Sequence, residues 1–282
     1  MRVHFISYGG GKHYIKSGKR LKKEAKRLNI FFSIKIYRSK HLPQFIKQSF
    51  LFGSENRGNG YWIWKPYLIY RELEKVSYGD VVVYSDCGNQ LIKGDGWNNF
   101  FELLKIHDAI FQQYREGEIY PWGNSLIKTW TKKSMIEFFS QNNNYEWVDK
   151  PQFQSCFIIV KKNRETLKLI KSWFRVMWVR PDLLIDTFGP EDSIQINFYR
   201  EHRHDQAVLS GVLLTQNYAK VYFMPEIVEP YEHNNDSVVK AMRIRDEIKE
   251  PFAGKVKRKI KHVIGQRRIN KIRSRLFNKK QF

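Results

Sequence analysis

Short hydrophobic runs alternate with segments of helical spacing along most of the chain. Val3–Ser7, Ile30–Tyr37 and Val81–Ser85 are rich in β-branched and aromatic residues, which is typical of strands. Between the last two lies Lys65–Val76, where apolar residues recur at steps of four and three, as on one face of a helix. This alternation predicts an α/β protein.

The same signals predict the remaining elements. Val81–Ser85 is almost continuously apolar, so we expect it in the middle of a parallel sheet that is covered by helices on both faces. A glycine-rich loop is predicted at Gly53–Gly60. Two further strands are predicted at Cys156–Lys161 and Val221–Met224, and helices at Lys12–Arg27, Leu42–Phe52, Phe100–Ile106, Ser134–Ser140, Glu165–Val176 and Ala207–Gln216.

Composition narrows the class of protein. The chain has 282 residues, 42% of them hydrophobic, which is enough for a folded core and excludes wholesale disorder. The two cysteines exclude a disulfide scaffold and a cysteine zinc site. No apolar run approaches the ~18 residues that a bilayer crossing needs, and the first residues do not read as a signal peptide. We therefore expect a cytoplasmic protein.

Positive charge is concentrated near the C-terminus. The chain carries 50 Lys and Arg against 28 Asp and Glu, a net charge of +22. Lys255–Phe282 holds 12 of the basic residues and no acid, with apolar residues spaced for one side of a helix. Such a helix can lie on an anionic membrane, although a solvated tail or nucleic-acid contact would use the same charge. We place a catalytic-size domain at 1–235 and a basic helical tail at 236–282. Lys12–Arg27 adds a second basic surface.

One candidate site follows the strand Val81–Ser85, which delivers Asp86 to its C-terminal end, with Gly88 two residues later. Ligands of open α/β sheets bind at this edge. A carboxylate there suits a divalent metal that carries phosphates. An ordinary turn would also accommodate Asp86 and Gly88.

A second candidate is the run from Arg57 to Pro66, RGNGYWIWKP. Its glycines free the backbone, and a helix begins near Lys65. A helix N-terminus beside a cation favours phosphate. Trp62 and Trp64 can stack on a sugar or base, or form part of the core.

The third candidate is the polar run Glu201–Gln206 before an apolar helix. His202 and His204 share one face if the run is extended, which permits metal binding. Histidines that form ordinary hydrogen bonds are the commoner case. Asp205 either caps the helix or acts in chemistry.

Together, the segments GYWIWKP, GDVVVYSDCG and EHRHDQAVLS resemble bacterial glycosyltransferases of the GT-A type that build capsule, O-antigen or other surface polysaccharides. In outline the pattern is also similar to glycosyltransferase families eight and thirty-two, where a strand ends in a DXD motif and a DQ segment follows. The resemblance spans roughly Arg2 to Met224. It implies a GT-A (Rossmann-like) mixed α/β sheet, a nucleotide-sugar donor and a glycan acceptor.

The resemblance also implies roles for single residues. Asp205 and Gln206 match the catalytic DQ pair beside the transferred sugar, and Asp86 matches the acid that holds Mn²⁺ or Mg²⁺. Gly88 stands where the second acid of DXD would be, so only one acid ends the strand. The residues expected to bind the donor are Tyr8, Gly9, Arg57, Lys65, Asp86, Gly88 and His204.

The functional prediction is a glycosyltransferase, of the hexosyltransferase type, that elongates a lipid-linked glycan at the inner face of the cell membrane. Asp205 would serve as the base in an inverting enzyme, whereas in a retaining enzyme Gln206 would face the anomeric carbon. Glu191–Asp192 is a second acid pair or a helix start, and His233 weakly resembles a late metal-binding histidine. The alternatives are a nucleic-acid-binding protein and a metal-dependent phosphoesterase that uses Asp86, His204 and Asp205. Because the second acid of DXD is missing, a degenerate transferase that only scaffolds its partners is a third.

Overall fold

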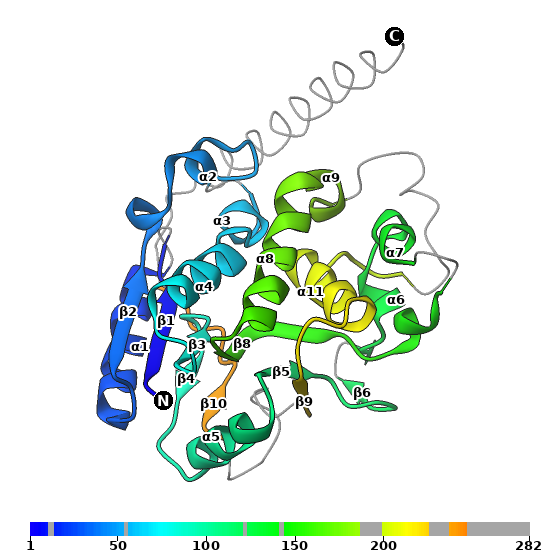
Figure 1. Cartoon of the computed structure of the whole chain (residues 1–282). Coiled ribbons are helices and arrows are strands. Elements are labelled where there is room, and N and C mark those ends of the chain that lie inside the picture. Colours follow the sequence, from blue (N-terminus) through cyan, green and yellow to red (C-terminus); the bar gives the residue numbers. More distant parts are fainter. Residues whose placement is uncertain are drawn as a thin grey trace.

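A mixed six-stranded sheet forms the centre of the protein (Figure 1). The computed structural model describes residues 1–10, 14–53, 56–120, 123–140, 144–186, 199–225 and 237–246. The strand order is β2-β1-β3-β8-β5-β9. The bounds are β1 Val3–Tyr8, β2 Ser33–Tyr37, β3 Val81–Ser85, β5 Ala109–Gln113, β8 Phe153–Lys161 and β9 Val221–Pro225.

The direction of β8 sets the topology of this sheet. β1 is parallel to β2 and β3, and β5 is parallel to β9, but β8 runs antiparallel between β3 and β5. Ile159 of β8 is paired with Val83 on one side and Ile110 on the other. β3 is therefore central, as predicted, but only one of its neighbours is parallel.

Helices cover both faces of the sheet. None of those in the described ranges is both long and apolar enough to cross a membrane. The longer ones are α1 Ile15–Leu28, α4 Trp64–Lys75, α5 Gly96–Ile106, α7 Lys133–Phe139, α8 Arg164–Val179 and α11 His204–Thr215. The short helices are η1 Ser39–His41, α2 Gln44–Gln48, α3 Gly58–Tyr61, α6 Ile127–Trp130, η3 Glu146–Asp149 and α9 Pro181–Leu184. Two pairs of short strands lie outside the central sheet. They are β4 Gln90–Leu91 with β10 Val239–Lys240, and β6 Ile119–Tyr120 with β7 Gly123–Asn124.

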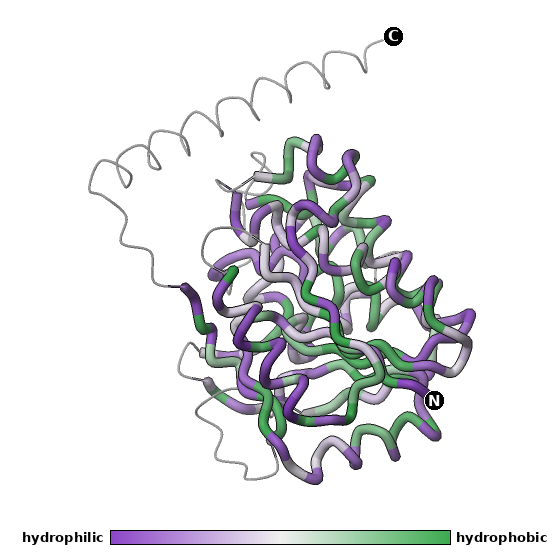
Figure 2. The backbone as a smooth tube through the Cα atoms, turned by 90° about the vertical axis from the view of Figure 1, so that its left-hand side faces the viewer, coloured by the Kyte–Doolittle hydropathy of each residue, from purple (hydrophilic) through white to green (hydrophobic). Residues whose placement is uncertain are grey.

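Alternating side chains of the central strands divide the core in two. In β3, Val82 and Tyr84 enter the core beneath α4, α8 and α11, whereas Val81 and Val83 enter the core beneath α1 and α5. The tube in Figure 2 shows hydrophobic stretches running through the strands and mixed character in the outer helices. The predicted class, an α/β sheet flanked by helices on both faces, is confirmed.

Several elements differ from those that the sequence predicts. The predicted helix Leu42–Phe52 is shortened to α2, because Pro43 precedes it with extended dihedrals and Ser49 returns the chain to an extended conformation. The strand β5 was not predicted, since its five residues show no clear alternation. The last predicted helix begins at His204, three residues before the expected start at Ala207.

The segment 237–246, which the sequence analysis assigned to the tail, packs on the domain. β10 within it pairs with β4, and the Asp246 carboxylate accepts hydrogen bonds from the backbone N–H groups of Lys16 (2.7 Å) and Ser17 (2.8 Å). Asp246 thus supplies hydrogen-bond acceptors for the free backbone N–H groups in the first turn of α1, whose own N-cap side chain makes no capping hydrogen bond. The predicted amphipathic helix in 247–282 lies outside the described residues, as do Glu191, Asp192 and His233.

Candidate active site

Three predicted site residues meet at one edge of the sheet. Asp86 follows the C-terminal end of β3, and the antiparallel β8 begins at the same edge, where the Asp86 N–H donates to the Cys156 carbonyl. Lys65 lies in the first turn of α4 and Asp205 in the first turn of α11. The fold therefore brings chain positions 65, 86 and 205 to the edge where α/β proteins bind ligands.

The Lys65 ammonium group is enclosed by this cluster. Its Nζ donates to Asp205 Oδ2 and Ser155 Oγ, both at 2.9 Å, and lies 3.5 Å from Asp86 Oδ1. Only 1% of Lys65 is exposed. Burial lowers the pKa of Lys65, but the carboxylates of Asp205 and Asp86 raise it by more, so the net shift is upward. Lys65 was predicted to contact a donor diphosphate, whereas its ammonium group is committed to protein partners.

Asp205 is buried and held from two sides. The Ser155 hydroxyl donates to Asp205 Oδ2 at 2.6 Å, the same oxygen that Lys65 contacts, and the Trp173 indole N–H donates to the Asp205 carbonyl at 3.1 Å. The alternative role as helix cap is not observed, because the N-cap of α11 is Arg203 and no side chain caps it. The carboxylate instead joins α11 to α4 and β8.

Asp86 is the more accessible carboxylate, with 31% of its side chain exposed. The Tyr84 hydroxyl donates to Asp86 Oδ1. Burial raises the pKa of Asp86, and the nearby Lys65 and Tyr84 oppose that rise. With both carboxylates ionised, Asp86, Asp205 and Lys65 carry a net charge of −1, so the cluster favours a group that develops positive charge.

The metal prediction was tested on these same residues. Within the described part of the chain, no group of three His, Cys, Asp or Glu residues is arranged to hold a metal ion. Asp86 contributes one carboxylate, whose Oδ1 is already bound by Tyr84 and faces the Lys65 cation. These residues alone do not fit Mn²⁺ or Mg²⁺. The phosphoesterase alternative needs Asp86, His204 and Asp205 as metal ligands. In the described part of the chain these three residues do not form a metal-binding group.

Gly9 and Gly88 stand where backbone segments approach closely. A Cβ on Gly88 would lie 3.3 Å from the Cα of Arg243, and the Gly88 carbonyl accepts a hydrogen bond from the Ile244 N–H (2.9 Å). A Cβ on Gly9 would lie 3.4 Å from the Cα of Gly18 in α1. Packing alone therefore explains both glycines, and their predicted contact with a donor stays a prediction.

Tyr8 connects the end of β1 to the glycine-rich segment. Its ring stacks on Trp64 with 3.9 Å between centroids. Its hydroxyl lies 3.0 Å from Ser39 Oγ and accepts a hydrogen bond from Asn59 Nδ2 at 2.9 Å. Tyr8 is buried, so its clearest role is to anchor the segment that carries Lys65.

That segment contains an unusual left-handed turn. All residues of Gly58–Trp62 have positive φ, including Asn59 (+56°), Tyr61 (+51°) and Trp62 (+59°). A left-handed conformation costs a residue with a side chain roughly 1–2 kcal/mol. Backbone strain of this kind clusters at functional sites.

The turn presses its aromatic rings against a buried histidine. His204, itself at φ +41°, lies 5.0 Å from Tyr61 and 5.7 Å from Trp62 between ring centroids. Its Nδ1 is 2.8 Å from the Leu184 carbonyl. Its buried Nε2 has no hydrogen-bond partner among the described residues but lies 3.6 Å from Asp186 Oδ1. Burial lowers the pKa of His204, although Asp186 opposes the shift.

His202, directly before Arg203, is also buried with a ring nitrogen against a backbone carbonyl. Its Nε2 lies 2.9 Å from the Leu183 carbonyl, and burial lowers its pKa well below the ordinary value. The carbonyls that hold the two histidines both belong to α9, which favours hydrogen-bonding roles over metal binding. Arg57 lies on the solvent-exposed side of His204. Its Nη1 is 3.6 Å from Asp186 Oδ1, the oxygen that His204 also approaches, and almost half of its side chain is exposed.

Gln206 extends the cluster along β8, where its Nε2 donates to the Phe153 carbonyl at 3.2 Å. Sequence reasoning missed Ser155 and Tyr84, which hold Asp205 and Asp86. The available signal was the polar pair Gln154 and Ser155 at the start of an otherwise apolar strand.

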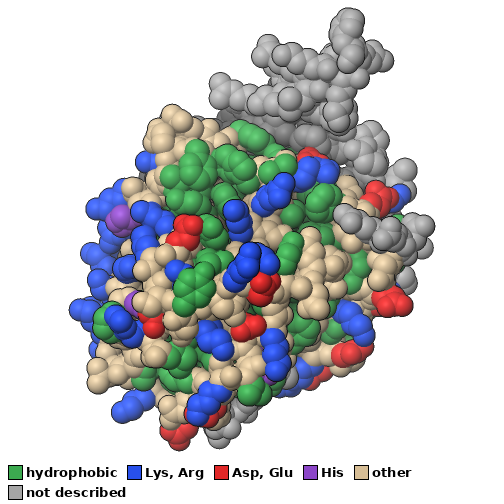
Figure 3. Space-filling view, viewed as in Figure 1, with side chains coloured by type: hydrophobic (Ala, Val, Ile, Leu, Met, Phe, Trp, Pro, Cys, Tyr) green, Lys and Arg blue, Asp and Glu red, His purple; other side chains and the backbone are tan. Residues whose placement is uncertain are grey.

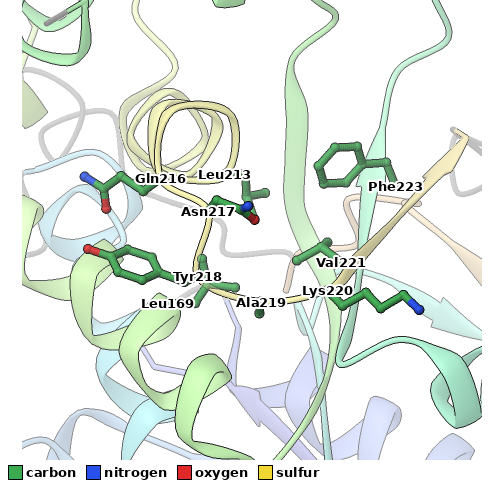
Figure 4. A pocket seen from close by; sticks show the side chains of 9 residues that line it. All are labelled: Leu169, Leu213, Gln216, Asn217, Tyr218, Ala219, Lys220, Val221 and Phe223. Atoms are coloured by element: carbon green, nitrogen blue, oxygen red, sulfur yellow. The ribbon is translucent and has the colours of Figure 1, made fainter.

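A separate cavity of about 260 Å³ lies between α8, the C-terminal end of α11 and β9 (Figure 4). Leu169, Leu213, Tyr218 and Phe223 are among its lining residues. Asp205 is at the opposite end of the twelve-residue α11, so about 15 Å of helix separates the two places. This cavity is not part of the cluster around Lys65.

Comparisons with known proteins give distant likenesses only. The sequence matches no protein family and no curated protein. Among solved structures, mouse xyloside xylosyltransferase 1 is 10% identical with a TM-score of 0.43, over 79% of this chain and 85% of that one. The galactosyltransferase LgtC, in complex with donor and acceptor sugar analogues, is 10% identical with a TM-score of 0.34, over 79% and 73%. Bifunctional IspDF from Campylobacter jejuni is 12% identical with a TM-score of 0.37, over 80% of this chain and 50% of its own.

Proposed function

We propose that this protein is a glycosyltransferase that moves a sugar from a nucleotide-sugar donor to a glycan acceptor. The observation that carries the proposal is the buried cluster of Asp86, Lys65 and Asp205 at the ligand-binding edge of the sheet. It combines one accessible carboxylate with one buried carboxylate, and Lys65 holds both in place.

The charge of the cluster suits glycosyl transfer. As the bond from sugar to phosphate breaks, the anomeric carbon gains positive character, by analogy with glycoside hydrolysis. A cluster with net charge −1 stabilises that carbon and repels the departing diphosphate. We therefore place the sugar toward Asp86 and Asp205, and the diphosphate toward Arg57 at the exposed rim.

In this arrangement Lys65 is a positioning residue. Its positive charge faces both carboxylates, and its contacts fix the starts of α4 and α11 against each other. The contacts of Lys65 and Ser155 with Asp205 both fall on Oδ2. Asp205 can then serve as base for an acceptor hydroxyl or bind hydroxyls of the transferred sugar, with Gln206 beside it.

The finer assignment concerns the acceptor and its location. We propose a lipid-linked glycan of a bacterial surface polysaccharide, such as capsule or O-antigen, elongated at the inner face of the cell membrane. The basic, apolar-striped sequence of Lys255–Phe282 supports attachment to an anionic membrane surface. Surface attachment would raise the local concentration of such an acceptor.

A thermal-shift screen of nucleotides and nucleotide-sugars tests the proposal on the wild type, Asp86→Asn and Asp149→Asn. Asp149 is an exposed carboxylate paired with Lys128 and serves as the matched control. A ligand at 100 times its Kd adds about 2.7 kcal/mol of stability. We expect one nucleotide-sugar to raise the Tm of the wild type and the control but much less that of Asp86→Asn. Repeating the screen with Mn²⁺ and Mg²⁺ shows whether an ion joins the diphosphate. Failure of every nucleotide to raise the Tm would contradict the proposal.

A further inference from the structure

Four aromatic rings from three helices form a connected group at the end of the molecule where α2 meets the C-terminus of α8. Phe45 in α2 lies edge-on to Tyr67 of α4 and Trp178 of α8, with 5.7 and 5.1 Å between ring centroids. Phe174 joins Tyr67 (5.6 Å) to Trp178 (6.0 Å) from the other side. The exposed Phe50 follows Phe45 by five residues along the chain, and the exposed Val179 comes directly after Trp178. We call the four rings and these two neighbours in sequence the aromatic patch.

The aromatic patch is open to solvent. Phe45, Phe50, Trp178 and Val179 are between 37% and 61% exposed. In Figure 3, hydrophobic side chains gather on the upper part of the visible face, near α2, with Lys and Arg side chains beside them. Scattered exposed apolar residues are normal, whereas a connected group that includes large aromatic rings marks an interaction surface.

Cations are interleaved with these rings. Lys171, Phe174, Arg175 and Trp178 follow one another at steps of three, one and three, which places them on one face of α8. Lys171 and Arg175 are exposed. The nearby Asp182 carboxylate is held by two hydrogen bonds from Arg180, at 3.0 and 2.7 Å. The surface around the patch is therefore apolar and positively charged.

We propose that the aromatic patch is a docking surface for an anionic lipid bilayer. Aromatic rings favour the interfacial layer of a membrane, and Lys and Arg beside them are attracted to anionic headgroups. Charge favours a bilayer over two other occupants, a second copy of this protein and the C-terminal segment of its own chain. A second copy, at a net charge of +22, and the basic Lys255–Phe282 would both be repelled by Lys171 and Arg175. Single-stranded nucleic acid is attracted by charge, but the rings pack against one another and offer few open faces for bases.

The aromatic patch and the candidate active site share α4 and the connection from α8 to α9. Tyr67 follows Lys65 by two residues in α4, so the two side chains leave different sides of this helix. After Val179 the chain enters α9, whose Leu184 carbonyl contacts His204. A bilayer on the patch would thus hold a membrane-bound acceptor close to the elements that carry the cluster. The inference deepens the proposed function, yet membrane binding is measured without donor or acceptor, so either can fail alone.

The first test places an environment-sensitive thiol fluorophore on the full chain at Phe50→Cys, with Lys26→Cys in α1 as control. Cys87 is buried and Cys156 partly buried, so the parent chain gives the labelling background. We expect vesicles of phosphatidylcholine with phosphatidylglycerol to shift the emission of the Phe50→Cys probe to the blue, and the control probe to shift less. No shift at Phe50→Cys while the protein sediments with vesicles would assign binding to another surface and overturn the proposal. The proposal would also be overturned if the probe emission shifted without vesicles. Such a shift could follow addition of an oligonucleotide, self-association of the protein, or contact with another segment of the same chain.

The second test compares two charge reversals on the same vesicles. Lys171→Glu/Arg175→Glu alters the patch, and Lys22→Glu/Lys26→Glu makes the same change in charge on exposed positions of α1 at the same spacing. At about 1 kcal/mol for each lost cation near the surface, the first pair should weaken vesicle binding at least tenfold. The second pair should weaken it clearly less. Equal losses would show that only total charge matters, which would overturn the assignment to the patch.

Discussion

The ammonium nitrogen of Lys65 lies 2.9 Å from Oδ2 of Asp205, although 140 positions separate the two residues in the chain. Both side chains are buried, so neither charge is balanced by water. The contact fixes the first turn of α4 against the first turn of α11 and orients a candidate catalytic carboxylate. A buried ion pair of this kind is costly to break from one side, because the remaining charge stays buried alone.

Replacing Lys65 by Met should therefore destabilise the fold strongly. The substitution leaves Asp205 and Asp86 without their shared cation, and we expect a loss of about 3–5 kcal/mol in the free energy of unfolding. Urea denaturation measures it. Lys168→Met, which breaks an exposed pair with Glu165, is the control and should change stability by less than ~0.5 kcal/mol.

The double variant Lys65→Met/Asp205→Asn separates charge from shape. Because it removes the ion pair from both sides, it should regain part of the stability lost in Lys65→Met, with a coupling energy of at least ~1 kcal/mol. Strictly additive losses in the two single variants would show that the pair is not coupled.

The sequence predicted which residues belong to this site better than it predicted the contacts between them. Asp86 was recognisable because a buried strand ends there, and Lys65 because a helix begins there. Their meeting with Asp205 depends on the order of strands, and an antiparallel β8 between β3 and β5 carries no local signal. Ser155 was hidden for the same reason.

Local signals also left out the partners and the backbone conformation of some residues. Lys65 was assigned to a donor phosphate, because a cation at a helix N-terminus looks available until burial and partners are known. The loop predicted at Gly53–Gly60 contains the start of a left-handed turn that involves Tyr61 and Trp62, residues that rarely adopt positive φ. In that conformation both rings pack against His204, a contact that the local sequence does not reveal.

Asp205→Asn should slow glycosyl transfer strongly while leaving a folded protein. The amide keeps the shape of the carboxylate but neither takes up a proton nor stabilises positive charge, and we expect a fall in kcat of about 10³-fold. Steady-state kinetics with the donor found by thermal shift measures it. Gln206→Ala should lower kcat less, and Asp182→Asn, at an exposed pair with Arg180, should leave it unchanged. Full activity in Asp205→Asn would remove this residue from the mechanism.

Gly60→Ala should disturb the left-handed turn beyond the ordinary cost of positive φ. Gly60 has φ +111°, and an added Cβ would lie 3.1 Å from the Leu51 carbonyl oxygen and 3.2 Å from the Cα of Phe52. Gly79→Ala is a matched control, because Gly79 has φ +82° and no atom of the described residues lies within 4 Å of its Cβ position. We expect a loss of about 1 kcal/mol at Gly79 and more than about 2 kcal/mol at Gly60. Equal losses, measured by thermal denaturation, would mean that the turn tolerates the methyl group.

Stability should fall on mild acidification because of His202. Burial holds the pKa of His202 well below its ordinary value of 6.5, and His204 and Lys132 oppose its protonation as well. Below pH 6.5 the unfolded chain therefore binds a proton that the folded protein excludes, so the free energy of unfolding decreases as the pH falls through this range. His204, whose pKa burial also lowers, contributes with the same sign.

The slope for each fully excluded proton approaches 1.4 kcal/mol per pH unit. Urea denaturation between pH 7.5 and 5.5 measures it for the wild type and for His202→Gln, whose amide can accept from the Lys132 N–H and donate to the Leu183 carbonyl as neutral His202 does. The variant should be less sensitive to pH than the wild type because one titrating group is gone. An identical slope in both proteins would mean that His202 binds protons equally in the folded and unfolded states. The excluded proton, and with it the neutral, hydrogen-bonded arrangement beside the site, would then have to be abandoned.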